Sequence, residues 1–138
     1  MLEVAARPIG GLCSRVLRFE ANGGQVTLEE LLLRHATGED TARFTRESRA
    51  AGVMMVPIPR RGIFKGVSHE RAARQVAHVE DVVMTAKPDQ LLEPLPEGDS
   101  YLGFIFARAE RSADVVSALR EAHRHLSFDI YPELRVIR

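Results

Sequence analysis

The run Tyr101 to Ala109, YLGFIFARA, is the stretch that decides the fold. It has the strongest β-strand character in the chain because aromatic residues stand at Tyr101, Phe104 and Phe106, and aromatic side chains favour a pleated, half-buried surface. We therefore predict that this run forms the central strand of a sheet.

A long helix is expected directly after this strand. Ser112 is suited to cap its first turn, and apolar residues then recur with the helical period of about 3.6 residues. These apolar residues are Val116, Leu119, Ala122 and Leu126. The pattern predicts a helix that ends near His125 and a last strand over residues 128–130.

The segments before the central strand predict further strands and one short helix. We expect strands at 53–58, 63–67 and 78–85, a helix from Ser68 to about Val76, and a short edge strand at Leu91 and Leu92 in an otherwise irregular segment, 87–99. The turn-like Arg60-Arg61-Gly62 suggests that the first two strands pair as a hairpin. The order predicts an α+β fold in which helices cover a mainly antiparallel sheet.

The first fifty residues have a different pattern. Residues 1–6 suggest a short strand, Leu12 to Phe19 a helical turn or two, and Asn22 to Gly24 a loop. A second helix is predicted by the capping-box pair Thr27 and Glu30. We expect one face of this helix to consist of Leu28, Leu31, Leu32 and His35. Gly38 is expected to end the helix. Because residues 40–49 resemble a linker, we assign residues 1–50 and 51–138 to separate domains.

Composition excludes several broad classes of function. The chain has 138 residues, with 19 Lys and Arg against 19 Asp and Glu, and its pI is near 7.0. General nucleic-acid and membrane-surface binders need a cationic excess, so we expect neither a nucleic acid nor a membrane as partner. The longest uncharged run, 50–59, is shorter than the roughly 18 residues typical of a membrane span. One cysteine, Cys13, fits a cytoplasmic protein.

Two charged residues near the N-terminus are the main candidates for chemistry. On a strand, Glu3, Ala5 and Arg7 would share one face, and the turn Gly10-Gly11 follows. A carboxylate can hold a Mg²⁺ ion that bridges phosphate oxygens, while an arginine can clamp a transferring group. The alternative is a surface ion pair, which is common and usually inert.

The sequence resembles a known enzyme family over nearly all of its length. The segment Leu2 to Phe19, LEVAARPIGGLCSRVLRF, is similar to the end of the ATP-grasp domain in carboxylate–amine ligases and their biotin-carboxylase relatives, where a strand with E-x-N-x-R precedes a glycine-containing turn. The rest resembles the C-terminal domain of the L-amino-acid ligase branch. The matching runs are RRGIFKGV (60–67), VVMTAKP (82–88), GDSYLGFIFAR (98–108) and ALREAHRHLSFDI (118–130).

This resemblance implies roles for individual residues. Glu3 matches the acidic Mg²⁺ ligand, and Arg7 matches the catalytic arginine near the transferred phosphoryl group and the acyl phosphate. Arg7, Gly10 and Gly11 would contribute to cofactor binding, whereas Ala5 stands where the family usually has a metal-binding Asn. Mg-ATP is thus implied for an intact relative. The lysines, glycine-rich flap and adenine pocket of an ATP-grasp domain would lie upstream of Met1, so we expect this chain alone to bind no cofactor.

Two functions follow as hypotheses. In the first, the chain is the C-terminal portion of an ATP-grasp ligase-like protein that activates a carboxylate as an acyl phosphate for attack by an amine. The chain alone would be non-catalytic, its partner would be a missing or separate ATP-grasp domain, and apolar surface would be exposed within residues 1–50. In the alternative, it is a stand-alone α+β binding or oligomerisation module, such as a homodimer, without nucleotide chemistry.

Other polar features are weaker candidates. Arg60, Arg61 and Lys65 form a basic cluster that could contact a substrate carboxylate or the phosphates of a nucleotide, although such clusters are more often simply solvated. His123 and His125 are two residues apart on the predicted helix, so they point to different sides and cannot chelate one metal ion.

Overall fold

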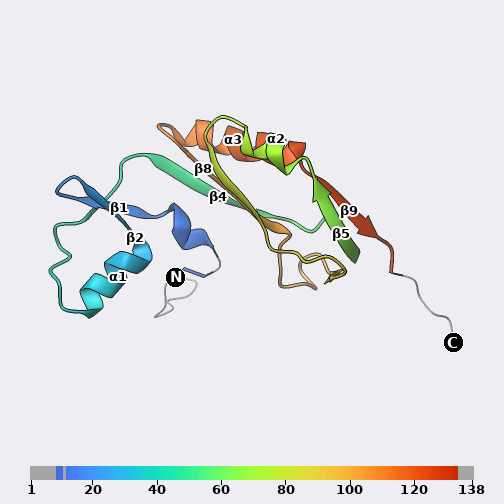
Figure 1. Cartoon of the computed structure of the whole chain (residues 1–138), viewed down its shortest axis with the longest axis horizontal. Coiled ribbons are helices and arrows are strands. Elements are labelled where there is room, and N and C mark those ends of the chain that lie inside the picture. The colour runs from blue at the N-terminus through green and yellow to red at the C-terminus, as the bar shows by residue number, and fades with distance from the viewer. Residues whose placement is uncertain (1–8, 11, 134–138) are drawn as a thin grey trace. The chain divides into compact units, whose positions relative to one another are not determined.

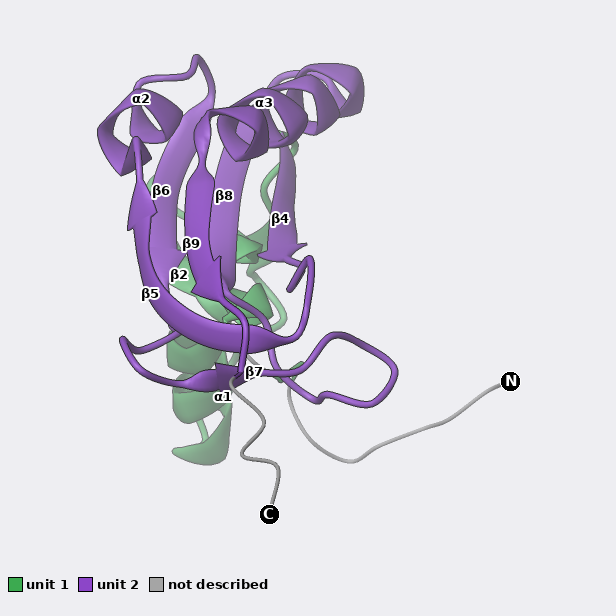
Figure 2. Ribbon diagram, turned by 90° about the vertical axis from the view of Figure 1, so that its right-hand side faces the viewer, with its two compact units in different colours: residues 1–49 green, residues 50–138 purple. Residues whose placement is uncertain are grey.

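The computed structural model describes residues 9, 10 and 12–133. The chain forms two compact units, residues 1–49 and 50–138 (Figures 1 and 2). The assignment of the first unit to an ATP-grasp domain remains a prediction.

The described part of the first unit is a small antiparallel sheet with a 3-10 helix and an α-helix. Its elements are the 3-10 helix η1 (Cys13–Val16), strands β1 (Arg18–Ala21) and β2 (Gly24–Thr27), helix α1 (Leu28–Ala36) and strand β3 (Thr45–Arg46). The strands are ordered β2-β1-β3. The helical turn expected from Leu12 to Phe19 therefore ends at Val16, because Phe19 lies within β1 and pairs with Val26.

The structure refines two further expectations for this unit. The loop predicted at Asn22 to Gly24 is the tight turn of the β1–β2 hairpin, in which Asn22 and Gly23 have φ of +53° and +76° and Gly24 already belongs to β2. Positive φ at both central positions is the conformation that matches the twist of the flanking strands. The segment 40–49 is more than a linker, since Thr45 and Arg46 pair with β1 and complete the sheet.

Helix α1 begins as its sequence predicts, but its apolar side chains remain accessible. The Oγ1 of Thr27 accepts a hydrogen bond from the backbone N–H of Glu30 at 3.2 Å. The Glu30 carboxylate does not complete a capping box with Thr27; it forms an ion pair with Arg34 at 2.7 Å. No residue of α1 is buried, and Leu32 and Leu33 are 42% and 66% exposed.

In its described residues, 50–133, the second unit contains two three-stranded antiparallel sheets and two helices. The elements are β4 (Ala50–Val56), β5 (Gly62–Ser68), α2 (Glu70–Arg74), β6 (Val79–Met84), β7 (Leu91–Leu92), β8 (Gly103–Ala109), α3 (Ser112–His125) and β9 (Ser127–Tyr131). One sheet has the order β4-β8-β6 and the other β7-β5-β9. This is the expected α+β class, with the expected order of elements.

Strand β8 is central to its sheet, as its sequence predicts. It pairs with β4 on one side and β6 on the other, and all seven of its residues are buried. Ile105, Ala107 and Ala109 belong to the hydrophobic core beneath the helices. The alternating residues Phe104, Phe106 and Arg108 lie on the opposite face of the strand.

The predicted hairpin between the first two strands of this unit is wrong. β4 pairs along its length with β8, whereas β5 pairs with β7 and β9 in the other sheet. Pro57 and Pro59 follow β4 directly, and because proline has no N–H to donate, the chain leaves the first sheet there. β5 then finds a longer partner in β9, with Phe64 opposite Ile130 and Val67 opposite Phe128.

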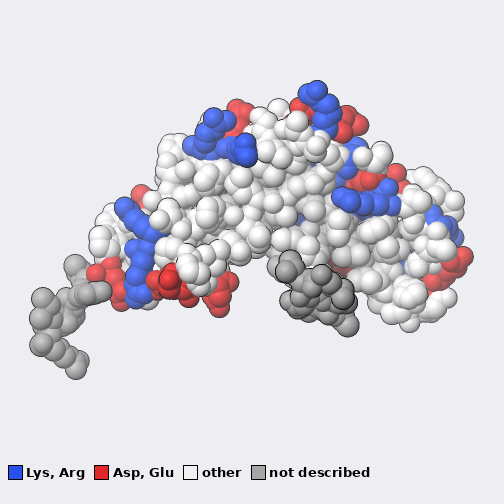
Figure 3. Space-filling view, turned by 180° about the vertical axis from the view of Figure 1, so that it is seen from behind, with Lys and Arg blue, Asp and Glu red and all other residues white. Residues whose placement is uncertain are grey.

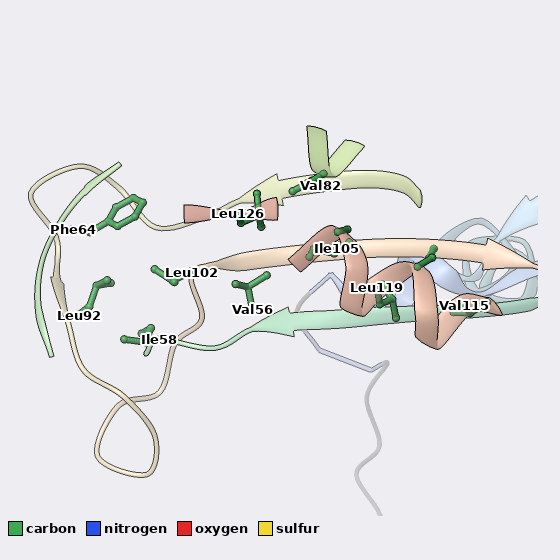
Figure 4. Packing of buried hydrophobic residues seen from close by; sticks show 14 of the residues in the cluster. Val56, Ile58, Phe64, Val82, Leu92, Leu102, Ile105, Val115, Leu119 and Leu126 are labelled. Atoms are coloured by element: carbon green, nitrogen blue, oxygen red, sulfur yellow. The ribbon is translucent and has the colours of Figure 1, made fainter. Parts of the chain in front are cut away.

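Helix α3 covers the β4-β8-β6 sheet and sits close to β4 (Figure 4). Its buried residues are Val115, Ala118, Leu119 and Ala122, and Val116, which we expected on the buried face, is 45% exposed. The helix begins one residue earlier than predicted: Arg111 is its N-cap, with no side-chain capping bond, and Ser112 is the first helical residue.

Helix α2 packs against β6 and α3. Its N-cap is His69, with a φ of +66°, rather than the predicted Ser68. One hydrophobic core joins both sheets of this unit: Phe64 and Leu92 come from the second sheet, and Val56 and Ile105 from the first (Figure 4). None of the helices in the described part of the chain is both long enough and apolar enough to cross a membrane.

Candidate functional site

The residues predicted to bind Mg-ATP lie almost entirely outside the described part of the chain. Glu3, Arg7 and Gly11 are not among the described residues. Gly10 is described, and it is exposed and belongs to no helix or strand. Among residues 9, 10 and 12–133, no cluster of three or more His, Cys, Asp or Glu side chains could hold a metal ion. The roles of Glu3, Arg7, Gly10 and Gly11 therefore remain predictions.

The basic cluster of the second unit is engaged in structural contacts. Arg60 donates a hydrogen bond to the carbonyl of Ile130 at 2.7 Å, and Lys65 pairs with Asp89 at 2.6 Å. Arg61 pairs with Glu133 at 3.0 Å and also with Glu93. The hydrogen bond to Glu133, followed by the charges of both carboxylates, raises the pKa of Arg61. These contacts tie β5 to the ends of β7 and β9.

The two histidines near the end of α3 are not brought together. His123 lies beside the ring of Phe128, with 6.3 Å between the ring centres, while His125 is exposed. This arrangement agrees with their spacing of two residues, which places them on different sides of the helix.

A groove of about 800 Å³ lies on the described surface of the second unit. It lies where the outer face of α3 meets β4. Its lining residues are Met54, Ser112, Ala113, Val116, Ser117, Arg120, His123 and Arg124. All except Met54 come from one face of the helix, since they recur every three or four residues.

The shape of this groove depends on how closely α3 approaches β4. Gly52 has no side chain, and a Cβ there would lie 2.8 Å from Cγ1 of Val115 and 3.3 Å from Cδ1 of Leu119. The buried stripe of α3 thus rests directly on the β4 backbone. Val116, next to Val115 in the helix, is consequently turned outward over the edge of the sheet.

The groove is apolar at one end and basic at the other. Ala113 and Val116 supply the apolar end, and Arg120 and Arg124 stand one helical turn apart at the other end, near Met54. No Asp or Glu belongs to its described lining. Two like charges four residues apart on a helix repel each other, so this pair slightly destabilises the helix.

Arg120 and Arg124 differ from most basic residues of the second unit. Within the described residues, neither side chain makes a hydrogen bond or an ion pair. Five other basic residues of this unit are each paired with a carboxylate, namely Arg61, Lys65, Arg74, Arg108 and Arg111. On the face in Figure 3, basic and acidic side chains likewise lie next to one another in several places.

Sequence analysis missed this groove. Nothing in the sequence distinguished Arg120 and Arg124 from the polar residues of any amphipathic helix, and Val116 was assigned to the buried face. Val115 and Val116 are adjacent apolar residues, so the helical period alone allowed either to be buried. The groove also requires β4 to be an edge strand beside α3, which depends on long-range strand pairing.

Comparison with known proteins identifies the family. Residues 54–131 match the model of "L-amino acid ligase C-terminal domain 2". The fold is similar to that of L-amino acid ligase from Bacillus licheniformis, with a TM-score of 0.65 and 21% sequence identity over 77% of this chain. The matched region is 27% of that ligase, so this chain spans about a quarter of its length. No curated protein shows significant sequence similarity to the chain. Because the family model covers more than half of the sequence, the chain belongs to the L-amino acid ligase C-terminal domain 2 family.

Proposed function

We propose that this chain acts as the C-terminal portion of an ATP-grasp ligase, which uses Mg-ATP to activate a carboxylate as an acyl phosphate for attack by an amine. The observation that carries the proposal is the family match over residues 54–131. The similarity of the fold to about a quarter of a solved L-amino acid ligase also supports it. The whole enzyme's activity is part of the proposal, since the chain spans so little of that ligase.

The chain by itself is proposed to be non-catalytic. Mg-ATP would need Glu3 and Arg7, which lie outside the described residues, so we derive no chemical step from them. Its role would be to form one wall of the ligase's active site and to pack against an ATP-grasp domain. We propose that the protein acts in the cytoplasm. Exposed apolar side chains at Ile9, Leu32 and Leu33 support such packing, because apolar surface of this kind is often covered by a partner.

The alternative function is a stand-alone binding or oligomerisation module. The same exposed leucines favour it, because Leu32 and Leu33 of α1 could equally be covered by α1 of a second copy in a homodimer. In this case no nucleotide would be involved.

Titration of the full chain with Mg-ATP in a calorimeter tests the first proposal. We expect no heat of binding, because Glu3 and Arg7 alone cannot replace the lysines, the glycine-rich flap and the adenine pocket that position ATP in an ATP-grasp domain. Micromolar affinity would overturn the non-catalytic role. The double variant Glu3→Gln/Arg7→Gln is the control, since any specific binding should disappear with it.

The size of the native protein separates the two functions. An antibody against residues 51–138 can detect the protein in its source cells, and peptide mapping can identify its ends. A band much larger than 15.4 kDa, with peptides upstream of Met1, supports the ligase portion. A band at 15.4 kDa supports the stand-alone module.

A further inference from the structure

Strand β4 offers an open edge of its sheet. It pairs with β8 on one side, and no strand within the described residues pairs with its other side. Its sequence, AAGVMMV, has no proline and no charged residue, which are the usual means of blocking an exposed edge. Alternate residues of this seven-residue edge strand can therefore donate and accept backbone hydrogen bonds with another extended chain.

The groove described above runs beside this edge. α3 points in the same direction as β4, because Ala109, just before α3, lies opposite Ala50, the first residue of β4. The apolar part of the groove, at Ala113 and Val116, thus lies toward the start of β4. Arg120 and Arg124 lie toward its end, near Met54.

The charges of the groove indicate what kind of segment would fit. Its described lining contains two unpaired arginines and no carboxylate. An added strand would point every second side chain toward α3. Carboxylates on that face could pair with Arg120 and Arg124, while small apolar side chains on the same face, further along, would cover Val116.

A second copy of the chain fits this surface less well. Pairing of β4 with β4 of a second copy would place two identical grooves side by side. Since neither groove contains Asp or Glu in its described lining, Arg120 and Arg124 would find no carboxylate from the other groove.

We propose that the open edge of β4 and the groove beside it bind an extended, acidic segment of a partner protein by strand addition. The segment presents carboxylates to Arg120 and Arg124 and small apolar side chains to Val116. This surface shares no residue with the predicted nucleotide site, and the proposal does not depend on the proposed ligase chemistry.

A designed peptide tests this proposal with the full chain. In the peptide ETETVTVT, blocked at both ends, the residues that face α3 in an antiparallel addition are Glu in the first half and Val in the second. The control peptide QTQTVTVT keeps the shape and removes the charge. We expect the Glu peptide to bind roughly three- to tenfold more tightly at low salt, which corresponds to two exposed ion pairs.

Two variants with the same change in net charge provide the protein control. Arg120→Gln/Arg124→Gln should lower affinity for the Glu peptide to that of the Gln peptide. Arg71→Gln/Lys87→Gln removes two exposed charges outside the groove and should leave the ratio between the peptides unchanged. Equal binding of both peptides to the original chain, or equal effects of the two double variants, would overturn the proposal.

Amide hydrogen exchange tests the mode of binding. Strand addition should slow exchange of β4 amides within residues 51–55 when the Glu peptide is bound. Binding without this protection would overturn strand addition. Concentration-dependent dimerisation that protects the same amides without peptide, measured together with light scattering, would also overturn the proposal, because the occupant would then be a second copy.

Discussion

Gly52 of β4 lies so close to Val115 of α3 that a Cβ on Gly52 would be 2.8 Å from Cγ1 of Val115. Real Cβ atoms essentially never show contacts this short. The side chain missing at Gly52 therefore sets the distance between helix and sheet, and with it the shape of the groove along the β4 edge.

We expect Gly52→Ala to destabilise the second unit. The added methyl group must displace Val115 or shift α3 as a whole, and overpacking of this kind typically costs about 1–3 kcal/mol. Urea denaturation followed by circular dichroism measures the change in free energy of unfolding.

Gly66→Ala in β5 is the matched control, because a Cβ at Gly66 would meet nothing within 4 Å. It should change stability by less than about 0.5 kcal/mol. A steric cause also predicts that Gly52→Ala costs less when Val115 is already alanine, since the two sites are in contact. An equal cost in both backgrounds would contradict the steric explanation.

Gly23→Ala is expected to weaken the β1–β2 hairpin without any clash. A Cβ at Gly23 would meet nothing within 4 Å, but the φ of +76° is one that residues other than glycine adopt at a cost of about 1–2 kcal/mol. Faster amide exchange in β1 and β2 would report the loss. Gly24→Ala serves as control: its Cβ would lie 3.5 Å from the carbonyl of Ala21, an ordinary contact, so exchange should change little.

Thr27→Ala should destabilise helix α1 by about 1 kcal/mol, because the N–H of Glu30 loses the Oγ1 acceptor that caps it. Amide exchange in the first turn of α1 measures this effect. Thr27→Ser retains the oxygen and should preserve most of the protection. If serine and alanine had the same effect, the lost methyl group rather than the hydrogen bond would be responsible.

Local signals in the sequence predicted the elements of the fold well. The aromatic run around Phe104 and Phe106 identified the central strand, because a strand buried on both faces needs apolar residues at successive positions. Thr27 and Glu30 located the start of α1 to the residue. In each case the deciding interactions lie within a few residues of one another in the chain.

Strand pairing was less predictable, because it depends on distant segments. The succession of β4, a turn and β5 suggested a hairpin, yet β4 joins β8 about fifty residues later in the sequence. The Asn22-Gly23 hairpin is a different case, since an Asn-Gly pair between strand-like residues is a strong local signal. We interpreted it as a loop because the preceding run, Leu12 to Phe19, was predicted to form a helical turn or two.

The candidate groove could not be predicted because it combines a helix face with an unpaired strand edge. Neither Val116 nor Arg120 is unusual in an amphipathic helix. Their significance appears only when Met54 lies next to them across the fold. The predicted nucleotide site differs from the groove in this respect. Glu3 and Arg7 were predicted from a sequence motif, and both lie outside the described residues.

The first turn of α3 provides a prediction about pH. Arg111 donates two hydrogen bonds to the carboxylate of Asp114, at 2.8 and 2.9 Å. These bonds, together with smaller effects of the charges on Arg111 and His78, lower the pKa of Asp114 from its ordinary value. Because the pKa is lower in the folded state, the ionised carboxylate stabilises the fold above the unfolded-state pKa, and this contribution is lost as the pH falls through the folded-state pKa.

Arg111→Gln should therefore raise the pKa of Asp114 toward its ordinary value, as measured by NMR titration of the side-chain carboxyl carbon. In the Arg111→Gln variant, protonation of Asp114 at low pH should also contribute less to the loss of folding stability. His78→Gln is the graded control, because the charge of His78 is the last of the causes and its removal should raise the pKa less. If His78→Gln raised the pKa as much as Arg111→Gln, charge rather than the Arg111 hydrogen bonds would control this carboxylate.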